Sequence, residues 1–103
     1  MALKGMKVDK FKGRFFEILK TTDLSQVAVM TIKPGGDGGP AERHEVGQII
    51  YVLEGEVEVM IDGEKNKVSE GEVVVIEKGK LHHVKSVGKK DLFFLSIYSP
   101  PAY

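Results

Sequence analysis

GDGGPAERHEVGQIIYVLEG, residues 36–55, holds the features that decide the fold. It brings a carboxylate, an imidazole and a carboxamide close together, from Glu42, His44 and Gln48, directly ahead of an apolar run. Glu42 and His44 are two positions apart, so an extended backbone directs both side chains to the same face. A turn at 45–47 would fold Gln48 back beside them. We therefore expect three potential ligand side chains to converge at the start of a strand.

Two series of residues share the spacing of a known pair of motifs. They are Gly36, Glu42, His44, Gln48 and Gly55, and later Gly71, Glu77, Gly79, His82 and Ser86. In the germin and cupin proteins the first motif reads Gly, five residues, His-x-His, three or four residues, Glu, six residues, Gly. Their second motif reads Gly, five residues, Pro-x-Gly, two residues, His, three residues, Asn. The chain therefore resembles a single-domain cupin over nearly its whole length.

The chemistry departs from the family pattern at four positions, although the spacing matches at every step. These are Glu42 for the first His, Gln48 for the Glu, Glu77 for the Pro and Ser86 for the Asn. The chain is similar to small bacterial and archaeal cupins whose first motif reads Glu-x-His with a following Gln. Their last strand ends Tyr-Ser-Pro-Pro, as residues 98–101 do here. The resemblance implies an all-β, RmlC-like fold, the antiparallel barrel known as a double-stranded β-helix or jelly roll.

Strand signals along the chain are typical of such a barrel. From Gln48 onward, runs rich in β-branched and aromatic residues recur about every eight to twelve residues. We expect one barrel domain over 14–103, with strands at 14–21, 26–32, 48–54, 56–61, 64–69, 73–76, 82–87 and 92–99. Residues 1–13 are basic and are expected to form an arm with at most a short strand, with a polyanion-binding patch as the alternative. The Gly- and Pro-rich run 33–40 is expected to be a flexible lip rather than a phosphate loop.

Alternation along the strands predicts which side chains enter the barrel. If Gln48 points inward, Ile50 and Val52 do so as well. The opposite set, Ile49, Tyr51 and Leu53, is then an apolar outer stripe, which predicts a homodimer. Motif spacing places His82 inside and leaves His83 on the surface. In the last strand the sequence leaves open whether the cavity is faced by Phe94, Ser96 and Tyr98 or by Phe93, Leu95 and Ile97.

Composition excludes several classes of partner and chemistry. The chain has 103 residues, 42% of them apolar, and its fifteen basic residues balance fifteen acidic ones. Balanced charge argues against nucleic acid and anionic membranes as partners. The absence of cysteine excludes disulfides, thiolate ligands and a cysteine nucleophile. No apolar run approaches the roughly 20 residues of a membrane-spanning helix, and no signal-peptide core is present, so we expect a soluble cytoplasmic protein.

The candidate ligands indicate a transition metal. Two imidazoles, a carboxylate and an amide oxygen, from His44, His82, Glu42 and Gln48, suit divalent first-row ions: Fe, Mn, Co, Ni, Zn or Cu. Two histidines with one carboxylate are also typical of open iron sites with positions free for substrate. The alternative is a hydrogen-bonded polar cluster that holds no metal. The joint spacing with His82 favours the metal.

Two functional hypotheses follow from this site. The first is a metal-dependent dioxygenase, isomerase or lyase acting on an oxygenated small molecule such as a sugar acid or a diketone. Small cupins that linearise unsaturated uronates, and polyketide cyclases of the fold, resemble this chain in having Gln among the ligands. Glu42, if it is not a ligand, or Tyr98, if it faces inward, would serve as the base. The second hypothesis is a non-catalytic ligand-binding or sensor module, because the same fold hosts both classes.

Overall fold

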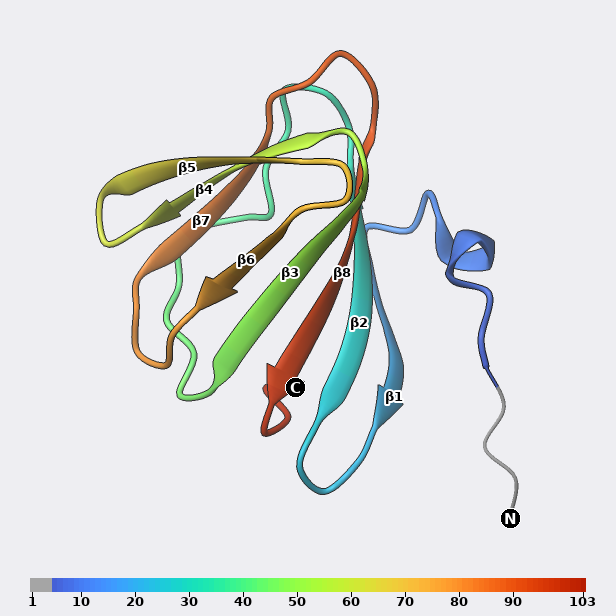
Figure 1. Cartoon of the computed structure of the whole chain (residues 1–103), viewed down its shortest axis with the longest axis vertical. Coiled ribbons are helices and arrows are strands. Elements are labelled where there is room, and N and C mark those ends of the chain that lie inside the picture. The colour runs from blue at the N-terminus through green and yellow to red at the C-terminus, as the bar shows by residue number, and fades with distance from the viewer. Residues whose placement is uncertain (1–4) are drawn as a thin grey trace.

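The computed structural model describes residues 5–103 and is built from two antiparallel sheets. The larger sheet has the strand order β1-β2-β8-β3-β6, and the smaller has the order β5-β4-β7 (Figure 1). The strands are β1 (Phe16–Thr21), β2 (Gln26–Ile32), β3 (Gly47–Glu54), β4 (Glu56–Ile61), β5 (Glu64–Ser69), β6 (Val73–Ile76), β7 (His82–Ser86) and β8 (Leu92–Ser99). Each expected strand is present to within two residues at either end. The all-β prediction is therefore confirmed.

An apolar core lies between the sheets. The larger sheet contributes Ile50, Val52 and Phe94 to this core, and Val57 and Val59 come from the smaller one. All five are at most 2% exposed. Burying a side chain of this kind stabilises the fold by about 1.5–3 kcal/mol relative to leaving it in water. Apolar contacts between facing side chains of the two sheets thus hold the barrel together.

The face predicted for β3 is confirmed. Gln48 is buried with its inward neighbours, whereas Tyr51 on the opposite face is 39% exposed. On β8 the inward set is Phe94, Ser96 and Tyr98, which the sequence left open. Strand β8 pairs with β2 on one side and β3 on the other, so Tyr98 lies opposite both Gln26 and Gln48 (Figure 1). This register carries Tyr98 to the same end of the sheet as the candidate ligands.

The N-terminal arm differs from its prediction. Residues 8–11 form a 3-10 helix, η1 (Val8–Phe11), where at most a short strand was expected; residues 1–4 lie outside the described part of the chain. Lys12 forms an ion pair with Glu54, and the Gly13 amide donates to the Thr31 hydroxyl over 2.9 Å. A single helical turn satisfies local backbone groups without a sheet partner. Between residues 5 and 103 no helix is long and apolar enough to cross a membrane.

The lip before β3 is paired along the edge of β7. Gly35 and Gly38 donate their amides to the Ser86 and Val84 carbonyls over 3.1 and 3.0 Å. A Cβ atom on Gly38 would lie 2.6 Å from a methyl carbon of Val84, so only glycine allows this approach. The segment expected to be a flexible lip is therefore attached to the smaller sheet by main-chain hydrogen bonds.

Two turn glycines give a stability prediction. Gly55 and Gly71 have φ of 83° and 81°, as expected for turn positions. A Cβ on Gly55 would also lie 2.6 Å from the Asp91 carbonyl oxygen, whereas none of the described atoms would lie within 4 Å of one on Gly71. We expect Gly55→Ala to lower the free energy of unfolding by about 2 kcal/mol or more and Gly71→Ala by about 1 kcal/mol. Chemical denaturation measures both.

The exposed Lys89 supplies the control for this comparison. Lys89→Ala should change the free energy of unfolding by less than about 0.5 kcal/mol. Equal losses for all three variants would contradict the strain argument.

Candidate functional site

A cavity opens at the end of the barrel where the lip meets β7 and β8. Its empty volume is about 430 Å³, counting the mouth that is open to solvent. Met30, Val84 and Phe94 form an apolar part of its wall. Glu42, His44, Gln48, His82 and Tyr98, the five side chains that the sequence singled out, all line this same cavity. The structure thus brings every predicted site residue together.

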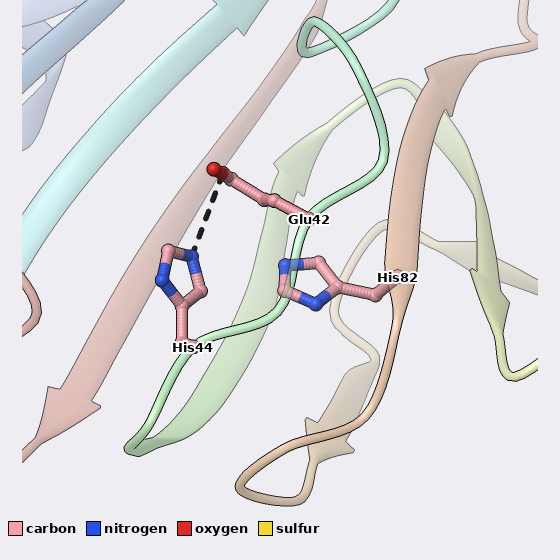
Figure 2. A group of neighbouring side chains, drawn as sticks. All are labelled: Glu42, His44 and His82. Carbon is pink, nitrogen blue, oxygen red and sulfur yellow. Dashed lines mark ion pairs between the residues drawn. The ribbon is translucent and has the colours of Figure 1, made fainter.

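Glu42, His44 and His82 converge most closely. One potential ligand atom from each lies within 4.8 Å of those from the other two (Figure 2). The Nε2 atom of His44 is 3.5 Å from a carboxylate oxygen of Glu42, and the two imidazole ring centres are 5.1 Å apart. A single ion can be reached by donors at this separation after small side-chain rotations.

Main-chain hydrogen bonds hold the lip against His82. The amides and carbonyls of Glu42 and His82 bond reciprocally, each over 3.0 Å. Just before β7, the Gly79 amide donates to the His44 carbonyl over 2.8 Å. Glu42 and His44 therefore keep a fixed position beside β7, although they lie in a segment without regular secondary structure.

The two imidazoles are suited to metal binding. The Nδ1 atom of His82 lies 3.1 Å from the Lys80 carbonyl oxygen, so it donates a proton there and leaves Nε2 free to coordinate. Burial, the largest cause, lowers the pKa of His44; the Glu42 carboxylate raises it and His82 lowers it. A lowered pKa favours the neutral imidazole, which is the form that binds a metal.

Gln48 offers a buried acceptor. Its side chain is 5% exposed, and its amide nitrogen donates to the hydroxyls of Ser96 and Tyr98 over 3.3 and 3.4 Å. Its Oε1 atom is buried without a hydrogen-bond partner among the described residues. A buried carbonyl oxygen is costly to leave unsatisfied. Together with two imidazoles and a carboxylate, this oxygen completes a donor set that fits a divalent first-row ion.

Tyr98 lies beside this cluster as a neutral phenol. Its ring centre is 5.5 Å from that of His44, in an edge-to-face arrangement. Burial raises the pKa of the Tyr98 hydroxyl far above its usual value, and the neighbouring Tyr103 raises it further. The hydroxyl therefore stays protonated at neutral pH and is suited to donate a hydrogen bond.

Sequence reasoning missed two contributors to the cavity wall. Tyr103 lines the cavity, and its hydroxyl lies 3.5 Å from the Glu42 carboxylate. His83, expected on the surface, is 25% exposed at its side chain and lies at the cavity edge with Nε2 3.4 Å from Asp37. Neither position belongs to the motif pattern. The aromatic character of Tyr103 is the only sequence signal that points to it.

The known proteins that are similar to this chain include two of known structure and one curated relative. A Bacillus halodurans protein of known crystal structure is 31% identical, with a TM-score of 0.83 over 87% of this chain and 73% of its own. KdgF from Halomonas sp. is 26% identical, with a TM-score of 0.76 over 84% of this chain and 77% of its own. The Myxococcus xanthus protein named Endoribonuclease YbeY is 29% identical over 93% of this chain. The chain spans only 31% of the length of that curated relative.

The family assignment rests on a match to a protein family. Residues 28–98 match the family described as Cupin domain. That stretch begins in β2, ends in β8 and includes both halves of the convergent site, the lip and β7. Because more than half of the chain matches, the chain belongs to the cupin domain family.

Proposed function

We propose that the chain binds a divalent first-row metal ion through Glu42, His44, Gln48 and His82 and acts on a small oxygenated molecule at that ion. The convergence of Glu42, His44 and His82 ligand atoms within 4.8 Å of one another carries this proposal. The unpartnered Oε1 of Gln48 supports it, because a metal would satisfy that buried oxygen. When bound, the ion would act as a Lewis acid toward a carbonyl or enol oxygen.

Residues of the chain supply the proton chemistry. Tyr98 stays protonated and donates a hydrogen bond to an oxygen of the bound small molecule. Its ring packs against His44 and excludes water from that side. Glu42 is 54% exposed at its side chain, so a proton that it accepts can pass to solvent at the mouth. Glu42 can act as this base only while it is not bound to the ion, and Tyr98, which burial keeps protonated, supplies a hydrogen bond.

The proposed substrate class is a small sugar acid, diketone or similar oxygenated compound. The cavity pairs polar donors with the apolar surfaces of Met30 and Phe94, which suits a short carbon skeleton bearing several oxygens. The reaction would be a dioxygenation, an isomerisation or a cleavage. The similarity to KdgF supports the fold that holds this cavity. The match to the Myxococcus protein covers too little of that protein to bear on substrate choice.

A non-catalytic ligand-binding or sensor module is the second candidate. Glu42 is the only carboxylate among the residues that line the cavity. If it coordinates the metal, the described wall holds no second carboxylate to act as a base, and the site would retain a ligand without turning it over. We place either activity in the cytoplasm, with the cysteine-free sequence as support.

We further propose a homodimer that buries the outer face of the larger sheet. Strand pairing sets Tyr51 beside Val73 and Ile49 beside Val75, and the two valines are 55% and 57% exposed. Covering apolar surface stabilises by about 25 cal/mol per Å², before the costs of association. This face is therefore suited to pack against a second copy of the chain.

Light scattering tests the dimer. We expect a mass twice that of the 11.4 kDa chain at micromolar concentration. Val75→Asp should shift the mass toward the monomer, because it buries a charge in the interface. Val87→Asp, at a 40% exposed position on another part of the surface, should leave the dimer intact. A monomeric wild-type protein would contradict the proposal.

Elemental analysis of protein purified without chelator tests the ligand set. We expect His82→Ala to abolish stoichiometric metal, because His82 anchors the ion from a separate strand. Glu42→Gln should weaken metal retention by removing the only carboxylate, and Gln48→Glu should strengthen it by adding a second. Gln48→Glu should also blunt the Lewis acidity of the ion.

His83→Ala is the matched control, since this neighbouring histidine lies outside the convergent group. It should keep the metal content of the wild type. If His82→Ala retains full occupancy in a folded protein, the constellation is a polar cluster and the metal proposal is wrong.

Turnover separates the two candidate functions. A panel of sugar acids, diketones and related carbonyl compounds is incubated with metal-loaded and metal-stripped protein. The enzyme proposal expects product only from the loaded sample, with Tyr98→Phe slowing turnover by about 10²-fold or more through loss of the hydrogen bond to the substrate oxygen. Saturable binding of a compound without product would instead support the sensor module.

A further inference from the structure

The segment 100–103 folds back across the cavity, outside both family motifs. Tyr103 is the residue of this segment that lines the cavity. Its ring centre lies 5.0 Å from that of Phe16, 5.3 Å from that of Tyr98 and 5.6 Å from that of His44. Aromatic rings at these separations attract one another beyond the effect of buried area alone. The ring of Tyr103 thus forms a roof over the imidazole of His44.

A buried side chain of β2 holds this segment in place. Gln26 is 1% exposed, and its Oε1 accepts hydrogen bonds from the Ala102 and Tyr103 amides over 3.1 and 3.0 Å. Its Nε2 donates to the main-chain oxygen of Tyr103 and to the Thr21 hydroxyl, each over 2.9 Å. Both acceptor positions and both donor protons of the carboxamide are therefore used. Three of these four hydrogen bonds join Gln26 to the main chain of Ala102 and Tyr103, in the segment 100–103 that we call the tail.

The hydroxyl of Tyr103 reaches the candidate ligand set. It donates to Oε1 of Glu42 over 3.5 Å, and the same carboxylate oxygen lies 3.5 Å from Nε2 of His44. Glu42 is otherwise an exposed side chain with freedom to rotate. A contact from the fixed tail restricts that freedom and keeps the carboxylate turned toward His44.

We propose that Tyr103, held by hydrogen bonds to Gln26, is a positioning residue of the site. Its ring controls access to His44, and its hydroxyl orients Glu42. The access role stands on the ring packing alone. The orienting role rests on the proposed metal function, because its consequence is metal retention. In this proposal a ligand that reaches His44 from the side of Tyr103 has to displace its ring, which favours small molecules.

Histidine labelling of metal-free protein tests the roof. Diethylpyrocarbonate modifies accessible imidazoles, and mass spectrometry of peptides gives the rate at His44 relative to His83 as an internal reference. We expect Tyr103→Ala to raise this ratio by about fivefold or more, because a covered group becomes permanently open. Gln26→Ala should act in the same direction by releasing the tail. Tyr103→Phe should leave the ratio unchanged, since it retains the ring.

Phe15→Ala is the matched control for these variants. Phe15 is 54% exposed and Tyr103 is 55% exposed, but Phe15 is not among the residues that line the cavity. The control should not change the labelling of His44. Because Tyr103 is largely exposed, Tyr103→Ala should remain folded even if Gln26→Ala does not. An unchanged ratio in folded Tyr103→Ala would overturn the roof.

Metal release tests the orienting role. Each protein is loaded with Co²⁺, and release to the chelator dipicolinate is followed through the visible absorption of the ion. We expect Tyr103→Phe to weaken Co²⁺ binding by about tenfold, as removal of a side chain that orients a ligand commonly does. Phe15→Ala should match the wild type.

The outcomes distinguish the two proposals. Wild-type Co²⁺ binding in Tyr103→Phe overturns the orienting role. If the wild-type protein binds no Co²⁺, both the proposed metal function and the orienting role are wrong, while the labelling of His44 still decides whether Tyr103 is a roof. Faster labelling in Tyr103→Ala together with weaker binding in Tyr103→Phe supports the whole inference.

Discussion

The reciprocal hydrogen bonds between the main chains of Glu42 and His82 are the constraint on which the site depends. Alternation within the strands can position Gln48 and Tyr98, but Glu42 and His44 lie in a segment with no strand of its own. Pairing along β7 gives that segment a strand-like direction, and Gly38 permits it because a larger residue would collide with Val84. Residues from the two motifs therefore meet through backbone geometry, before any ligand is considered.

Charge is distributed across the cavity according to burial. Glu42, the one carboxylate of the wall, is 54% exposed at its side chain, where an ionised group keeps most of its hydration. Gln48 is 5% exposed and neutral, although the family motif has a Glu at this position. Compared with that motif, the negative charge has moved from the buried position to the exposed one. The exchange keeps one anionic donor and avoids the penalty of an ionised group in the interior.

Sequence predicted the parts of the structure that follow from regular periodicity and from motif spacing. The strands and the two faces of β3 were predicted because side chains alternate with a period of two and the apolar set is uninterrupted. The inward face of β8 was not predicted, since Phe94 and Phe93 lie on opposite faces and both faces carry apolar residues. Only the pairing of β8 with β2 and β3 decides which face points inward. The lip and the 3-10 helix of the arm have no periodicity to detect. The place of Tyr103 depends on hydrogen bonds to Gln26, which no local pattern encodes.

The proposed ligand set also bears on the charge of what the cavity receives. A divalent ion held by one carboxylate and three neutral donors keeps a net positive charge, because Glu42 is the only anionic group of the described wall. Tyr98 and Tyr103 line the same cavity, and such surroundings would screen that charge less than bulk water does. An anionic oxygen, such as a carboxylate or an enolate, would balance it at close range, whereas a cationic ligand would be repelled. With this ligand set, the proposed site would therefore favour oxygen-rich acids and enolisable carbonyl compounds over amines.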